Sequence, residues 1–194
     1  SQWGMPPLEA LDAEGWSALT YAAYAGDAAA VHLLIEAGAT VKGVDSEGLT
    51  ALHYVARHED GGANSCKIAQ LLVAAGADVN ALCPAMCSPL HESCAEHNHE
   101  VALVLLRAGA DLHAWNSEGN TAVHLVCTNN YDTYGDDMLM ILGALGGSFE
   151  DVNVARQTPL HRAIQQGAGW DLVEVLHEFC PTLDWSPKDE EGNT

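Results

Sequence analysis

Apolar residues recur along the chain with the spacing of short amphipathic helices. Segments such as ALTYAAYAG, ALHYVARH and PLHESCAEH carry Leu and Ala at helical intervals. Each is followed by a second apolar segment, as in VHLLIEAGA, IAQLLVAAGA and VALVLLRAGA. Apolar residues three and four positions apart indicate one buried face of an α-helix. The pattern therefore predicts consecutive pairs of short helices joined by polar turns.

The first helix of each predicted pair begins at a nearly constant tetrapeptide, which recurs at offsets of 38, 33 and 37 residues. Its copies are TALH at Thr50–His53, SPLH at Ser88–His91, TAVH at Thr121–His124 and TPLH at Thr158–His161. A Thr or Ser hydroxyl can cap a helix, and proline is tolerated in the first turn because that position needs no N–H. The AGA turns at Gly38, Gly76 and Gly109 predict the ends of the second helices, with glycine in the left-handed conformation.

Together, the tetrapeptide and the AGA turn resemble the ankyrin repeat, whose period is about 33 residues and whose signature is T-P-L-H-x-A. The resemblance implies an all-α repeat solenoid, built from helix-turn-helix units that each carry a β-hairpin finger. It spans residues 12–185 and gives five repeats, at about 12–44, 45–82, 83–115, 116–152 and 153–188.

Both ends of the chain lie outside these five repeats. Residues 1–11 are interpreted as a lead-in or a scar left by expression, and residues 189–194 repeat the D-x-x-G-x-T that opens a finger. The chain is therefore expected to be a fragment of a larger protein, cut at the start of a sixth repeat, and to be monomeric.

Two of the offsets exceed the ordinary period, and the extra residues are predicted between the two helices of a repeat, near 58–65 and near 130–136. Tolerated insertion is the simpler interpretation, because lengthening a surface loop costs only about 0.6 kcal/mol per doubling. A contact role stays open for the second insertion, NNYDTYGDD, which contains two tyrosines and three aspartates.

Charge and cysteine usage restrict the partners. Seven Lys and Arg residues stand against 27 Asp and Glu residues, which gives a net charge of −20. Such a chain repels phosphate backbones and anionic lipids, so neither nucleic acid nor a membrane is expected as a partner. No apolar run approaches the ~18 residues of a membrane span. The six cysteines are predicted to be reduced thiols, which favours a cytoplasmic or nuclear protein.

The stretch CPAMCSPLHESCAEHNH, residues 83–99, holds three Cys and three His. It is similar to a metal site at first sight, but the repeat register explains His91 as the tetrapeptide histidine and Cys94 as a small buried residue. Ligands of one zinc ion must converge to about 2.0–2.3 Å from it, which residues on different helix faces do not do. The sequence therefore predicts no metal, no cofactor and no catalytic Cys–His pair.

In ankyrin domains, ligands generally meet the fingers and the first helices, so the apolar residues at variable positions there are candidates for partner binding. Leu82 and Trp115 precede the residue that opens a finger, and Trp16 and Leu49 precede the helix-capping Ser or Thr. Pro84 and Met86 belong to the divergent third finger, CPAM, and Tyr24 ends a first helix. An exposed apolar strip indicates an interaction surface. The alternative for Trp16 and Trp115 is packing on the next finger.

Acidic residues accompany this strip. Glu14, Glu47, Glu118 and Glu191 each precede a finger glycine, and Glu92 and Glu96 lie on the predicted first helix of the third repeat. These carboxylates either form a solvated face or line an acidic wall that binds a Lys- or Arg-rich segment.

The predicted function is therefore a non-catalytic protein–protein interaction module for a basic, partly apolar peptide or domain. The alternative is the regulatory or substrate-recruiting ankyrin domain of a larger enzyme, such as a ubiquitin-ligase adaptor, kinase, phosphodiesterase or methyltransferase.

One asparagine is a candidate for modification. The segment LLVAAGADVNAL resembles the ankyrin sites of the oxygen-sensing asparaginyl hydroxylase, with Asn80 as the target and Leu72 eight residues before it. Asn153 imitates the pattern but falls on the residue that opens a finger. A structural role for Asn80 in the turn is the alternative interpretation.

Overall fold

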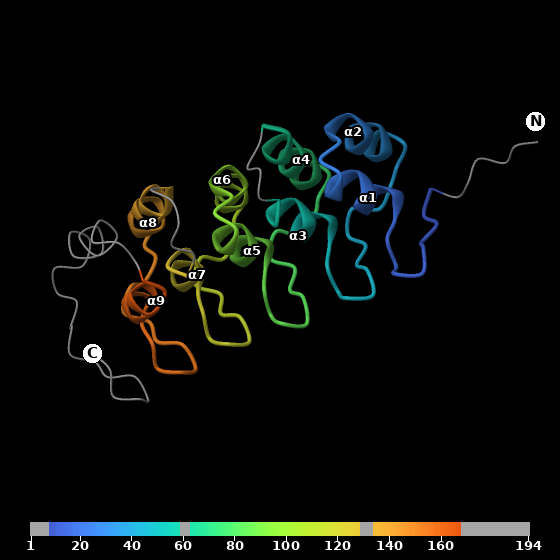
Figure 1. The fold of residues 1–194 in the computed structure, drawn as a ribbon. Coiled ribbons are helices and arrows are strands. Elements are labelled where there is room, and N and C mark those ends of the chain that lie inside the picture. The colour runs from blue at the N-terminus through green and yellow to red at the C-terminus, as the bar shows by residue number, and fades with distance from the viewer. Residues whose placement is uncertain (1–7, 59–62, 129–133, 168–194) are drawn as a thin grey trace, which may run out of the picture.

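The computed structural model describes residues 8–58, 63–128 and 134–167. The first helices of the repeats are Ala18–Tyr24 (α1), Ala51–Ala56 (α3), Pro89–Ala95 (α5), Ala122–Val126 (α7) and Pro159–Gln165 (α9). The second helices are Ala28–Glu36 (α2), Ala63–Ala74 (α4), His99–Arg107 (α6) and Tyr134–Ala144 (α8). Successive first helices pack on one another, and each of the first four also packs on the second helix of its own repeat. The result is the predicted all-α solenoid, with loops projecting from one side (Figure 1).

Each first helix begins where the sequence places its cap. The hydroxyls of Ser17, Thr50, Ser88 and Thr158 accept backbone N–H groups of the first turn. Pro89 and Pro159 occupy the first helical turn. The second helices end as predicted too, because Gly38, Gly76 and Gly109 have φ of 91°, 87° and 90°.

The tetrapeptide histidine joins each repeat to the next finger. In the third repeat, Nδ1 of His91 lies 3.1 Å from the Ser88 backbone nitrogen and accepts its N–H, while Nε2 lies 3.1 Å from the Ala114 carbonyl oxygen. His53 and His124 repeat this arrangement with the carbonyls of Cys87 and Gln157. Since Nδ1 accepts, the proton is on Nε2 and each ring is a neutral bridge between repeats.

The projecting loops are tight turns of five residues, here called the first to fifth fingers. They are Asp12–Trp16, Asp45–Leu49, Cys83–Cys87, Asn116–Asn120 and Asn153–Gln157. In each finger the first residue donates its backbone N–H to the carbonyl of the last. A single isolated bridge, Val44 with Thr50, is the only β-pairing within the described parts of the chain. The predicted β-hairpins are therefore turns closed by one or two hydrogen bonds.

Neighbouring fingers stack through their backbones. The N–H of Ser46 donates to the Glu14 carbonyl, and that of Val154 donates to the Glu118 carbonyl, both at 2.9 Å. This approach requires glycine: a Cβ on Gly119, which has φ of 74°, would lie 2.8 Å from the Val154 nitrogen. Between the second and third fingers the donor position is occupied by Pro84, which has no N–H to offer.

The core runs between the helix layers. The apolar tetrapeptide residues Leu19, Leu52, Leu90, Val123 and Leu160 are buried. A second buried set is small, as the register predicts: Ala23, Ala56, Cys94 and Cys127 are at most 1% exposed. Side chains of this size allow successive first helices to approach closely.

Several predictions fall on residues outside the described ranges. The two insertions were predicted between α3 and α4 and between α7 and α8. In both places the connection is longer than the one between α1 and α2 or between α5 and α6. Residues 59–62 and 129–133 of these connections are not described, and neither are residues 1–7 and 168–194. The last of these ranges includes Glu191, the predicted second half of the fifth repeat and the expected start of a sixth.

Candidate protein-binding surface

The residues that precede the fingers are exposed, as the sequence predicts. Val44, Leu82, Trp115 and Val152 are between 45% and 56% exposed, although all four are apolar. They occupy the same place in four successive repeats, directly before the residue that opens the finger. The solenoid therefore presents an apolar residue at the base of each of these fingers.

The residues that end the fingers do not behave as predicted. Leu49 is only 3% exposed, so the expectation that it belongs to an exposed apolar strip is wrong. Its N–H and carbonyl both bond to Asp45 across the finger, and its side chain lies in a buried cluster with Tyr54 and Cys83. The equivalent Asn120 is also buried and donates its amide to the Glu118 carboxylate at 2.9 Å. These side chains fill the space between fingers.

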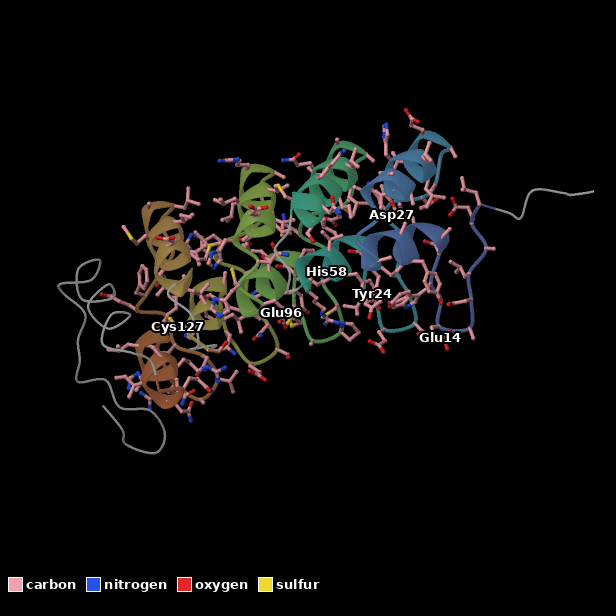
Figure 2. All side chains as sticks on the ribbon, turned by 45° about the horizontal axis from the view of Figure 1, so that its top comes forward. Glu14, Tyr24, Asp27, His58, Glu96 and Cys127 are labelled. Atoms are coloured by element: carbon pink, nitrogen blue, oxygen red, sulfur yellow. The ribbon has the colours of Figure 1, made fainter. Side chains whose placement is uncertain are left out.

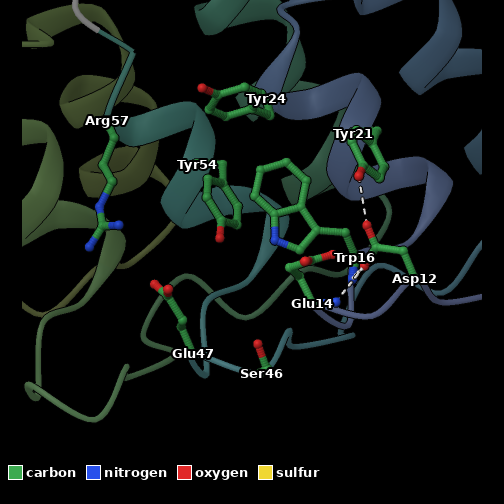
Figure 3. A pocket seen from close by; sticks show the side chains of 9 residues that line it. All are labelled: Asp12, Glu14, Trp16, Tyr21, Tyr24, Ser46, Glu47, Tyr54 and Arg57. Carbon is green, nitrogen blue, oxygen red and sulfur yellow. Dashed lines mark hydrogen bonds between the residues drawn. The ribbon is translucent and has the colours of Figure 1, made fainter.

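Trp16, in the same slot of the first finger, is half-buried and lies at the centre of an aromatic cluster. Its ring centroid is 5.0 Å from that of Tyr21, 5.1 Å from that of Tyr24 and 4.6 Å from that of Tyr54. The interplanar angles are 55° to 66°, so the indole packs on the three phenol rings in tilted to edge-on geometry. Figure 3 shows the indole surrounded by the three phenol rings, which come from α1 and α3.

Carboxylates fix two of these tyrosines. In the first repeat the Tyr21 hydroxyl donates to Asp12 at 2.6 Å, and in the second repeat the Tyr54 hydroxyl donates to Asp45. The bond to Asp12 raises the pKa of Tyr21, while burial, followed by the bond to Asp45, raises the pKa of Tyr54. Both phenols therefore stay neutral and hold their rings in place.

The cluster lines a cavity of about 520 Å³ between the first and second repeats. Glu14, Glu47 and Ser46 from the finger tips line it together with the aromatic rings, and Arg57 lies at the edge opposite Asp12 (Figure 3). Glu14 and Glu47 are exposed, and neither carboxylate bonds to another residue of the described part of the chain. The cavity therefore combines aromatic walls with two available negative charges.

The remaining acidic candidates differ in environment. Glu118 is exposed but already accepts the Asn120 amide, and Glu96 is partly buried at the end of α5. Figure 2 shows Glu96 farther along the solenoid than Glu14 and Tyr24. The predicted acidic column is thus interrupted at the third finger, where Ala85 takes the glutamate position.

The third finger keeps the left-handed backbone of the other fingers at its fourth position but, like the fifth finger with Arg156, without a glycine there. Pro84 and Met86 are both exposed, and Met86 has φ of 56° in the position that glycine holds in the first, second and fourth fingers. An apolar side chain in the left-handed region is strained, and such strain is concentrated at functional positions. The exposure of both residues keeps them as candidates for partner binding.

Three potential metal ligands converge near this finger. One ligand atom each from Cys83, Cys87 and Glu92 lies within 4.8 Å of the other two. Burial raises the pKa of the Cys87 thiol to about 11, and Glu92 already forms an ion pair of 2.8 Å with Arg57. A zinc ion at this place would therefore have to displace Arg57 from Glu92 and a proton from Cys87. Cys94 was the cysteine considered above for a Cys–His pair. It is buried, and burial raises the pKa of its thiol to about 12.

Asn80 bridges two repeats through its exposed side chain. Its amide nitrogen donates to the Gly109 carbonyl at 3.2 Å, and its amide oxygen accepts the Asp111 N–H at 2.8 Å. Asn153 is buried and opens the fifth finger, as its register predicts. The modification of Asn80 stays a prediction.

Sequence reasoning did not select Tyr54 or Arg57 as site residues. Tyr54 corresponds to Tyr21 one repeat earlier, and both follow the third tetrapeptide residue by two positions. This correspondence was the signal in the sequence that could have indicated a pair of tyrosines at the junction of the first two repeats. The contact of Tyr54 with Tyr24, whose ring centroids are 5.9 Å apart, depends on how one repeat packs on the next.

Comparison with known protein families agrees with this geometry. Residues 6–83 match the family described as ankyrin repeats (3 copies), and residues 86–117 match the family described as ankyrin repeat. The chain belongs to the ankyrin-repeat family, whose members generally mediate protein–protein interactions and are typically non-catalytic. No match is found among curated proteins. Beyond residue 117 the repeat geometry continues with α7 and α9. None of the described helices has the length and apolar character to cross a membrane.

Proposed function

We propose that the fingers and first helices bind a basic, partly apolar segment of another protein. One observation supports the proposal: exposed carboxylates occur in fingers whose bases carry exposed apolar residues. Val44 is 56% exposed beside the second finger, which carries the exposed Glu47. Trp115 is 54% exposed beside the fourth finger, which carries the exposed Glu118.

The apolar residues supply the affinity in this proposal. Large apolar side chains such as Trp115 and Leu82 lose water when a partner covers them, and central aromatic anchors dominate the energy of most interfaces. Their exposure in the free protein is what an unoccupied binding surface requires.

The charges supply speed and selectivity. A net charge of −20 attracts a basic segment over a Debye length of about 8 Å at physiological salt. Association should therefore be fast and should slow as salt is added. The same field repels acidic proteins, which restricts the choice of partner.

The proposal also places the protein in a reducing compartment, the cytoplasm or the nucleus. The cysteines within the described ranges, Cys66, Cys83, Cys87, Cys94 and Cys127, are free thiols, which supports this location.

The test uses a fluorescent peptide in which Lys and Arg alternate with Leu, and a matched peptide in which Glu replaces the basic residues. Fluorescence anisotropy should show binding of the basic peptide only. Trp115→Ala and Leu82→Ala should each weaken binding by about 1–3 kcal/mol with little change in melting temperature. Leu33→Ala is the matched control, because Leu33 is 64% exposed on α2, in the second-helix layer.

Equal binding of the two peptides would contradict the charge argument. A weakening by Leu33→Ala as large as that by Leu82→Ala would show that any exposed apolar side chain suffices, and would contradict the assignment to the finger side.

A further inference from the structure

We propose that the cavity between the first and second repeats binds an alkylammonium group, the end of a single lysine side chain of the partner. This inference deepens the proposed function and rests on it. The cavity is lined by Trp16, Tyr24 and Tyr54 and by the carboxylates of Glu14 and Glu47.

The aromatic walls suit a cation. The face of an aromatic ring carries negative potential and attracts an ammonium or guanidinium group within about 6 Å of the ring centroid. Trp16 provides the strongest such face, and Tyr24 and Tyr54 pack on adjacent sides of it and meet each other edge to face at 89°. An ammonium group bound in the cavity, where these rings meet, therefore contacts more than one ring.

The carboxylates give the cavity its sign. Glu14 and Glu47 lie on adjacent finger tips, held in register by the bond from the Ser46 N–H to the Glu14 carbonyl. Their exposed side chains have no partner among the described residues, so both remain available to a bound cation. An anionic ligand would meet two negative charges and the negative faces of the rings.

The next junction of the solenoid supports this assignment. By repeat register, Tyr24 corresponds to Arg57, and Tyr54 corresponds to Glu92. Arg57 and Glu92 form an ion pair of 2.8 Å across the second and third repeats. The second junction thus contains a cation from the chain itself. The first junction has a tyrosine in that slot and leaves the acidic side without an internal cation.

Arg57 also lines the cavity, and its charge has to be accounted for. Its guanidinium is committed to Glu92, and the bond to that carboxylate raises the pKa of Arg57. It therefore neutralises Glu92 and leaves Glu14 and Glu47 to the ligand.

The experiment measures binding of small probes by NMR. The chain has five tryptophans, and the indole N–H signal of Trp16 is identified by its loss in Trp16→Phe. The probes are N-acetyl-lysine amide, its Nε-trimethyl derivative, and the neutral Nε-acetyl derivative. Either ammonium probe should shift the Trp16 signal to saturation, and the neutral probe should not.

Variants test the named residues. Glu47→Gln and Tyr24→Ala should each weaken binding of the ammonium probes about threefold to tenfold. Tyr24→Phe, which keeps the ring, should retain the binding that Tyr24→Ala loses, and Leu33→Ala, on the second-helix layer, should bind like the wild type. Tighter binding of the trimethyl probe would assign the site to methylated lysine, and tighter binding of the unmodified probe to lysine; either result supports an alkylammonium site.

A Trp16 signal that does not move, or that moves equally with the neutral probe, overturns the inference. The proposed function can fail separately. If the basic peptide still binds through Trp115 and Leu82 while the Trp16 signal does not respond to the ammonium probes, the proposed binding surface stands and the alkylammonium site does not. If the probes bind but the peptide does not, the pocket is correct and the broader surface is wrong.

Discussion

The buried tetrapeptide histidines should make the stability of this solenoid fall in mild acid. His53, His91 and His124 are at most 1% exposed, and burial lowers the pKa of each below its ordinary value of 6.5. For His91, hydrogen bonds to backbone carbonyls and the carboxylates of Glu92 and Asp111 act in the opposite direction, but burial is the larger effect.

The sign follows from proton linkage. A histidine with a lowered pKa stays neutral in the folded state and binds a proton in the unfolded state once the pH falls below 6.5. Its contribution to stability is therefore complete above pH 6.5 and is lost as the pH falls toward the folded-state pKa. Because one proton per histidine is the most that the unfolded state can gain, each such histidine lowers the free energy of unfolding by at most about 1.4 kcal/mol between pH ~7.5 and ~5.5.

Carboxylates also titrate in this range, so the measurement compares variants. Glutamine at the third helical position keeps a capping box, which makes His91→Gln a suitable replacement. The variant should lose a constant amount of stability because the bond to the Ala114 carbonyl is gone. The difference in free energy of unfolding between wild type and variant should then narrow on acidification from pH ~7.5 to ~5.5, by at most about 1.4 kcal/mol.

Urea denaturation at both pH values gives these free energies. His32→Gln is the control, because His32 lies on the surface of α2 with its side chain 54% exposed. The reasoning would be refuted by a gap between wild type and His91→Gln that does not change with pH, since that result means His91 takes up a proton equally in the folded and unfolded states.

Three further predictions concern other parts of the molecule. Gly119→Ala should lower the free energy of unfolding by about 2–3 kcal/mol more than Gly38→Ala, because both have positive φ but only the first would clash with the next finger; equal losses in urea denaturation would argue against the clash. Reversing Glu47 and Glu118 to Lys should slow association with the basic peptide and flatten its salt dependence in stopped-flow measurements, while Glu36→Lys on α2 should do neither. Incubation with the asparaginyl hydroxylase, iron and 2-oxoglutarate should add one oxygen to the peptide containing Asn80 and none to that containing the buried Asn153; mass spectrometry that finds no added oxygen, with a control substrate modified, removes the site.

Local chemistry is what made the helices predictable. The hydroxyl of Thr50 caps α3 by bonding to a residue three positions away, and Gly76 ends α4 because its own φ is positive. Such interactions lie within a few residues of sequence, so one repeat reveals them and the next confirms them. The burial of Cys94 follows in the same way, from its place in a recurring helix face.

The candidate site was only half predictable, because fingers meet residues that are distant in sequence. The exposure of Trp115, which precedes a finger, was correctly expected, whereas Leu49, the last residue of a finger, is buried. One residue precedes its finger and the other ends it. Which of these two positions is covered depends on how the neighbouring fingers stack, as the contact of Leu49 with Cys83 shows.

The amino-acid sequence by itself determined the repeat, its register, the helix ends and the acidic character of the chain. Only the tertiary structure decided that Trp16 and Tyr24 meet Tyr54 across two repeats, and that Arg57 is neutralised by Glu92 while Glu14 and Glu47 are not. The reason is physical. Caps and turns are formed by bonds within one repeat, but a pocket between repeats depends on the distance and angle at which two units pack, and those are properties of the stacked solenoid.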